Sequence, residues 1–232
     1  MKQMPHASRS VSALLCLIVC ASVAAQAQSV DEYEHLAAQL GMTTIRTGSQ
    51  PHPWEVRIWT EGLVTSESGI GLLVRFWPTP TGVTGESIAF WRRGTGAGVD
   101  SVWRAQGKTE TWLEYNVKLF RCVHLREVGD YTICEQRPQY RDSWTRVHRA
   151  FVSNGGWTIP DEPPRPPGYP WILDGGGWYG EMQHDGQHRS VRYWNTKADD
   201  PPPWRDAYRI EQQVDCALRD YGKYCHRARS ER

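Results

Sequence analysis

The sequence predicts an α+β fold: an antiparallel β-sheet with about three flanking helices, in a single domain stapled by disulfides. Three observations carry this prediction. Alternating or apolar runs between residues 54 and 135 are typical of strands, three other segments repeat apolar residues at helical spacing, and four cysteines lie beyond residue 27. No internal repeat runs through the 232 residues.

The first 27 residues have the three parts of a secretory signal. Lys2 and Arg9 precede the apolar run Val11–Val23, and Ala25-Gln26-Ala27 supplies small residues. We expect cleavage after Ala27 and a periplasmic or secreted protein. The run is shorter than the roughly 20 residues that a spanning helix needs, which disfavours an anchor. Lipidation at Cys20 is disfavoured because Val19 replaces the usual small residue.

The charge of the mature chain limits its partners. Removal of residues 1–27 takes two basic residues and leaves 25 basic against 26 acidic, a formal charge of −1. Such a balance offers no electrostatic footprint for nucleic acid. No later segment is apolar for long enough to cross a bilayer, so an integral membrane protein is not expected. We expect one domain over residues 28–225 and a disordered tail over 226–232.

The even cysteine count in an exported chain predicts two disulfides and no metal site, because the close spacing of zinc ligands is missing. A three-residue hairpin loop at residues 127–129 would place Cys122 directly opposite Cys134, within disulfide reach. The remaining pair is then Cys216 with Cys225.

Three helices are predicted from caps and apolar spacing. The first starts at the Ser29–Glu32 capping box and stops at Gly41, and the second carries Trp144, Val147 and Phe151. The third follows the prolines at 201–203, runs to about residue 221, and should be the longest and pack on the sheet. A proline-rich connection spans residues 159–170. Residues 54–61 and three later segments, including WLEYNVKLFRCVHL from residue 112, are expected as strands.

Residues 174–195, DGGGWYGEMQHDGQHRSVRYWN, predict a second hairpin. Asp185-Gly186 is a two-residue turn signal, which sets Trp178 opposite Tyr193 on a buried face. The other face carries mixed polar and aromatic residues, with Glu181 on the diagonal from Arg192. From that face we select a candidate binding surface: Tyr179, Glu181, His188, Arg192 and Trp194.

The same region resembles a family of uncharacterised bacterial exported proteins. The resemblance rests on DG followed by Trp178, Glu181, Gly186, Val191 and Trp194, with Trp144 and Trp157-Thr-Ile-Pro160 upstream. That family typically shows a DGxxWxxE hairpin before a C-terminal helix. At Trp194 this chain departs from it, since Tyr193 stands where the family usually has Arg. The resemblance implies fold boundaries and no activity.

No motif assigns a catalytic residue or a cofactor. GxSxG and HExxH are absent. A glycoside-hydrolase pair stays open because its spacing is spatial, and Glu86, Glu114 and Glu181 are its candidates. Twelve Trp, against four Phe, are unusual for a domain of this size. They form either an exposed binding platform or core filler.

Three function classes remain. The preferred one is a noncatalytic exported protein that binds a macromolecule, either a cell-envelope component or a protein partner, through a Trp-rich surface. The alternatives are a cell-wall or glycan hydrolase and a protein inhibitor of an enzyme. A binder should show a contiguous patch of exposed Trp, a hydrolase should show two carboxylates in one cleft, and an inhibitor should project a rigid convex loop.

Overall fold

The computed structural model of the protein describes residues 33–46, 51–60, 70–94, 97–136, 143–164, 177–194 and 196–218. The chain divides into two compact units, residues 1–44 and 45–232. The first unit contains a helix over residues 33–39, and Gly41 follows it at φ +74°. This confirms the first predicted helix and its stop. The predicted signal peptide and the Ser29–Glu32 capping box lie outside the described residues.

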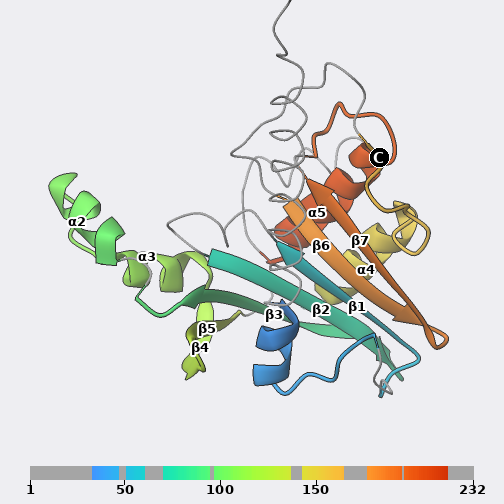
Figure 1. Ribbon diagram of the computed structural model, residues 1–232, viewed down its shortest axis with the longest axis horizontal. Coiled ribbons are helices and arrows are strands. Elements are labelled where there is room, and N and C mark those ends of the chain that lie inside the picture. The colour runs from blue at the N-terminus through green and yellow to red at the C-terminus, as the bar shows by residue number, and fades with distance from the viewer. Residues whose placement is uncertain are drawn as a thin grey trace, which may run out of the picture. The chain divides into compact units, whose positions relative to one another are not determined.

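The second unit is built on a seven-stranded antiparallel sheet (Figure 1). Its spatial order is β4-β5-β3-β2-β1-β6-β7, so the C-terminal hairpin β6–β7 pairs with the first strand of the chain. The strands are β1 Trp54–Thr60, β2 Ile70–Thr79, β3 Gly82–Arg92, β4 Cys122–Val128, β5 Tyr131–Gln136, β6 Gly177–His184 and β7 Gln187–Trp194. The predicted α+β class is confirmed.

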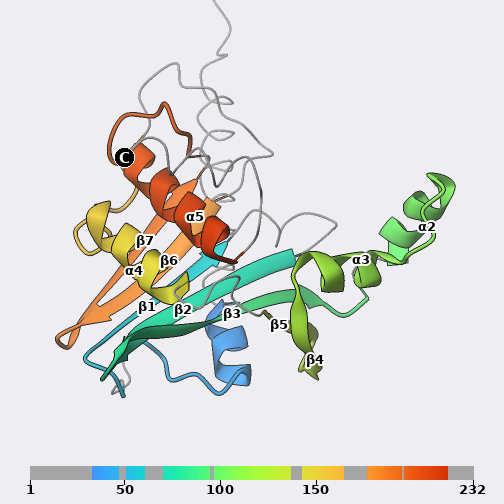
Figure 2. The same cartoon turned by 180° about the vertical axis from the view of Figure 1, so that it is seen from behind.

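Helices α4 (Ser143–Ser153) and α5 (Trp204–Leu218) cover one face of this sheet (Figure 2). Alternation along β1 sends Val56 and Ile58 to that face, where they join the main hydrophobic core. The helices contribute residues at helical spacing: Trp144, Val147, Phe151, Ala207, Ile210 and Val214. Both helices were predicted, and α5, with 15 residues, is the longest helix among the described residues of this unit.

Two further helices, α2 (Ala97–Ala105) and α3 (Trp112–Leu119), correct the prediction of about three helices. The stretch from residue 112 was expected to be a strand. A capping box begins α3 instead: the Thr111 hydroxyl accepts the Glu114 N–H at 3.2 Å, and the Glu114 carboxylate accepts the Thr111 N–H at 2.7 Å. Figures 1 and 2 both show α2 lying beyond the edge of the sheet, with α3 between α2 and the sheet.

The disulfide Cys122–Cys134 is present, with a Cα–Cα distance of 5.3 Å. Its predicted register was wrong. The β4–β5 turn has two residues, with Gly129 at φ +56°, and Val128 pairs with Tyr131. This turn shifts the ladder away from the predicted Cys122–Cys134 pairing, and a bulge after Cys122 moves the pairing back by one residue. Cys122 therefore pairs with Gln136, two residues beyond Cys134 on the same face of β5, and its side chain still reaches Cys134. Both cysteines of this bridge lie within the described residues.

The second predicted disulfide joins Cys216 to Cys225. Cys216 lies in α5, and Cys225 lies outside the described residues. The Cys216–Cys225 bridge stays a prediction. No helix in the described ranges combines the length and apolarity needed to cross a membrane.

The β6–β7 hairpin has the predicted register. Trp178 pairs with Tyr193, Gly180 with Val191, and Met182 with Arg189. Asp185 and Gly186 form the turn at φ +50° and +76°, as a type I′ turn requires. The hairpin therefore presents the face that the sequence predicted, because side chains alternate between the two sides of a strand.

Candidate functional site: an aromatic cluster and a charged network

The five residues of the predicted binding surface share one face of β6–β7, but they differ in exposure. Tyr179 and Glu181 are buried, whereas His188, Arg192 and Trp194 are partly exposed. Ligand binding by these five residues, and the predicted diagonal ion pair of Glu181 with Arg192, stay predictions. The structure places the two buried members beside a group of four charged residues, of which the sequence analysis selected only Glu86.

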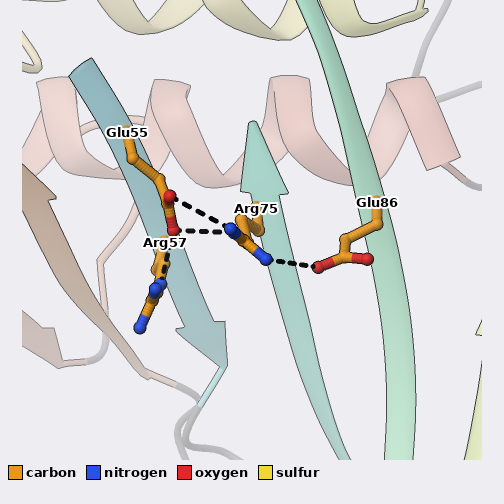
Figure 3. A network of polar contacts seen from close by, with 4 residues as sticks. All are labelled: Glu55, Arg57, Arg75 and Glu86. Atoms are coloured by element: carbon orange, nitrogen blue, oxygen red, sulfur yellow. Dashed lines mark hydrogen bonds and ion pairs between the residues drawn. The ribbon is translucent and has the colours of Figure 1, made fainter. Parts of the chain in front are cut away.

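That group is a charged network on the sheet face opposite α4 and α5 (Figure 3). It comprises Glu55, Arg57, Arg75 and Glu86, from three adjacent strands. Glu55 Oε1 accepts hydrogen bonds from Arg57 Nε and Arg75 Nε, both at 2.7 Å, and Glu55 Oε2 accepts from Arg75 Nη2 at 3.1 Å. Arg75 Nη1 also donates to Glu86 Oε1 at 3.1 Å.

Strand register explains why Glu55 is needed at this position. Arg57 pairs directly with Arg75 across β1 and β2, and like charges in that position repel each other. Glu55 lies two residues before Arg57 and therefore on the same face. Its fully buried carboxylate bonds to both guanidiniums, so it offsets their repulsion and satisfies three of their N–H groups.

The network continues on β6, where Glu181 pairs in register with Arg57. Glu181 Oε1 lies 3.6 Å from Arg46 Nε, and Arg46 Nη2 donates to the Tyr179 hydroxyl at 2.7 Å. Burial, followed by the Glu181 charge, raises the pKa of Tyr179, so its hydroxyl stays protonated at neutral pH. The Tyr179 hydroxyl donates to Glu181 Oε1 at 3.4 Å.

The three carboxylates considered for glycoside hydrolysis each have a local partner. Glu86 binds Arg75, Glu181 lies beside Arg46 and Tyr179, and Glu114 caps α3. The Thr111 hydrogen bonds lower the pKa of Glu114, which is the opposite of what a general acid requires. Arg75 stands between Glu55 and Glu86, where a hydrolase would hold the sugar oxygen and water.

A second feature is an aromatic cluster on the helix-covered side, at the sheet end where β1 begins and β6 ends. We define the cluster as Trp54, His148, Trp157 and His184, from β1, α4, the segment after α4, and β6. Trp54 stacks on His148, with ring centroids 4.7 Å apart and planes at 10°. Trp157 meets Trp54 at 5.7 Å and His184 at 5.0 Å.

The cluster sits on the edge of the core. Phe76 and Phe151 pack beneath it, at 6.2 Å from Trp54 and 5.1 Å from Trp157. Trp54, His148 and Trp157 are partly exposed and His184 is exposed. Burial lowers the pKa of His148 from its usual 6.5, so its imidazole is neutral at neutral pH. A neutral imidazole has one donor and one acceptor nitrogen, so His148 can offer both beside the indole rings.

The Trp side chains of this fold divide between buried and partly exposed positions. Six Trp are core residues: Trp59, Trp91, Trp112, Trp144, Trp178 and Trp204. Five others are partly exposed: Trp54, Trp77, Trp103, Trp157 and Trp194. Two of these five form the aromatic cluster. Trp77 lies on the opposite face, stacked on His52 at 5.3 Å and covered by the Arg75 guanidinium at 4.6 Å.

The sequence analysis missed Glu55, Arg57 and Arg75. A usable signal was present, because strict alternation in WEVRIWTE places the first two on the face opposite Val56 and Ile58. The aromatic cluster had no such local signal, since Trp54 and His148 are 94 positions apart in the chain. No group of three or more metal-ligating side chains occurs within the ranges that the structure describes.

Comparison of the chain with protein-family models, with curated proteins and with solved structures finds no match.

Proposed function

We propose that the protein is an exported, noncatalytic protein that binds a cell-envelope polysaccharide through the aromatic cluster. The observation that carries this proposal is the gathering of two partly exposed indoles and two imidazoles at one end of the sheet. Four separate segments supply these rings, so the folded chain alone assembles them. The predicted signal sequence and the Cys122–Cys134 bridge support an oxidising destination.

The chemistry of the cluster suits a sugar polymer. A pyranose ring has an apolar C–H face, which can lie on an indole, and a rim of hydroxyls that need hydrogen-bond partners. Trp54 and Trp157 supply the aromatic surface, and His148 and His184 supply ring nitrogens beside it. The cluster itself contains no carboxylate and no guanidinium, which favours a ligand recognised by stacking rather than by charge.

Co-sedimentation with purified peptidoglycan tests the proposal. The processed protein should be retained by peptidoglycan, and Trp157→Ala should weaken retention by about tenfold or more, the usual effect of removing a Trp hot spot. Trp103→Ala is the matched control, because Trp103 is also partly exposed but lies in α2 against Tyr115. The proposal is wrong if the wild type is not retained, or if both variants lose retention equally.

The same co-sedimentation experiment distinguishes binding from the hydrolase alternative. Soluble muropeptides released from the peptidoglycan would be measured by chromatography, and the proposal expects none above the protein-free blank. Release that disappears in Glu86→Gln or Glu181→Gln would favour hydrolysis, because these carboxylates are two of the three candidates from the sequence. The partners that Glu86 and Glu181 already have argue against that role.

The inhibitor alternative has one observation in its favour. Helices α2 and α3 extend beyond the sheet and carry exposed apolar side chains at Val102, Leu113, Tyr115 and Leu119. Such a projecting apolar surface fits a protein partner. A protein captured from envelope extract by the wild type and by Trp157→Ala, but not by Leu113→Asp, would favour this class.

A further inference from the structure

We infer that Arg189 is the positioning residue of the aromatic cluster: its guanidinium holds the segment that presents Trp157 to the ligand. The inference rests on the proposed function for its biological meaning. Its physical content is independent of the ligand, because it concerns how the protein fixes one indole ring in place.

The segment after α4 has no regular structure of its own from residue 159 to 162, yet it is densely tied to the rest of the fold. Arg189 donates from Nη1 to the Trp157 carbonyl and from Nη2 to the Ile159 carbonyl, the latter at 2.7 Å. The Tyr193 hydroxyl donates to the Pro160 carbonyl at 2.6 Å. A segment without its own ladder therefore has its carbonyls satisfied by β7.

Strand geometry makes Arg189 the tie nearest the cluster. Arg189 and Tyr193 lie four residues apart on the same face of β7, which separates them by about 13 Å along the strand. Tyr193 holds the middle of the segment at Pro160, whereas Arg189 binds the carbonyl of Trp157 itself. Loss of Arg189 would remove the tie between β7 and the end that carries the indole, and would leave that end held by the turn after α4, where the Thr158 and Ile159 N–H groups donate to the Gly155 carbonyl at 2.8 and 2.7 Å.

The Trp157 ring is confined by three neighbours from different elements. Its centroid lies 5.7 Å from Trp54, 5.1 Å from Phe151 and 5.0 Å from His184. These contacts orient the ring only while its backbone stays in place. An indole that is already ordered loses no conformational freedom when the ligand binds. The Arg189 hydrogen bonds should therefore raise the affinity although Arg189 does not contact the ligand.

The guanidinium is chemically suited to this task. Its planar fork can donate to two carbonyls at once in a fixed geometry, whereas a lysine ammonium is a point donor on a flexible stem. Arg189→Gln should therefore release the segment, and Arg189→Lys should restore little of the effect. Arg209→Gln is the matched control, since Arg209 is an exposed arginine of α5.

A double-mutant cycle between Arg189 and Trp157 tests the inference, with purified peptidoglycan as the probe. Arg189→Gln should weaken the apparent affinity by about tenfold when Trp157 is present, the value of a charge-assisted hydrogen bond, and by less than about twofold in the Trp157→Ala background. Arg209→Gln should leave the apparent affinity unchanged in both backgrounds. An equal loss in both backgrounds would overturn the inference, because Arg189 would then act without Trp157.

Near-UV circular dichroism makes the result independent of peptidoglycan. If Arg189 positions the indole, Arg189→Gln changes the aromatic spectrum of the wild type and leaves that of Trp157→Ala nearly unchanged. This signature supports the inference even if the wild type fails to bind peptidoglycan and the proposed function falls. A spectral change of the same size in both backgrounds refutes it, whatever the binding result.

Discussion

Replacement of Glu55 by Gln removes one negative charge from the centre of the charged network and keeps the size of the side chain. Glu55 is fully buried and accepts three hydrogen bonds from Arg57 and Arg75, at 2.7, 2.7 and 3.1 Å. A Gln side chain has one acceptor oxygen in place of two, and its amide group would point N–H groups at a guanidinium. Two directly opposed arginines would then lose their common counter-charge.

The expected cost follows from this burial. Removing one partner of a buried ion pair typically costs about 3–5 kcal/mol, because the remaining charge stays buried without compensation. The whole free energy of unfolding of a domain is about 5–15 kcal/mol, so Glu55→Gln should remove a large share of it. Urea unfolding followed by Trp fluorescence would measure the loss as a fall in the midpoint at unchanged slope.

Glu86→Gln is the matched control. It makes the same chemical change beside the same Arg75, but the Glu86 side chain is 39% exposed, and Glu86 Oε1 accepts a hydrogen bond from Arg75 Nη1 at 3.1 Å. Exposed pairs contribute about 0–1 kcal/mol, so this variant should lose little stability. A loss below about 1 kcal/mol for Glu55→Gln, or equal losses for both variants, would refute the account of the network as a buried, mutually dependent unit.

Two further predictions concern stability. Burial lowers the pKa of His148 in the folded protein, so the unfolded chain binds the proton more readily. The contribution of neutral His148 to the free energy of unfolding is therefore present above about pH 6.5 and is lost as the pH falls through the folded-state pKa. Urea unfolding at a series of pH values between 7.5 and 5 should show this loss in the wild type and a smaller one in His148→Gln; parallel curves would contradict it. Replacing Cys122 and Cys134 together by Ala should cost about 3 kcal/mol, because their bridge closes a loop of sequence separation 12. The same unfolding assay would count against this entropic account if the double variant lost less than about 1 kcal/mol.

Local rules predicted the parts of the fold that depend on neighbours in the chain. The β6–β7 register follows from a turn that needs two positive φ values, and a period of two then assigns every side chain of the hairpin to a face. Helices α4 and α5 follow from apolar residues at helical spacing. The Cys122–Cys134 bridge was found for the right reason, proximity in a hairpin, even though a later turn and a bulge changed its register.

Local rules failed where two patterns competed. Residues 112–119 mix aromatic and aliphatic residues, which suit either a strand or a helix, and the Thr111–Glu114 capping box decides for the helix. The capping signal was legible in the sequence, so this error came from weighting apolar content above the cap.

By itself, the sequence determined the α+β class, the hairpin faces, three of the helices and the alternation that puts Glu55 and Arg57 on one side of β1. Only the tertiary structure decided that Arg75 would bind the same Glu55 carboxylate as Arg57. It also decided that four rings would meet at one end of the sheet, those of Trp54, His148, Trp157 and His184. The physical reason is range. Caps, turns and periodicity act over a few residues. The pairing of β1 with both β2 and β6 instead brings together segments that are distant in the sequence, and no local preference specifies which strands pair.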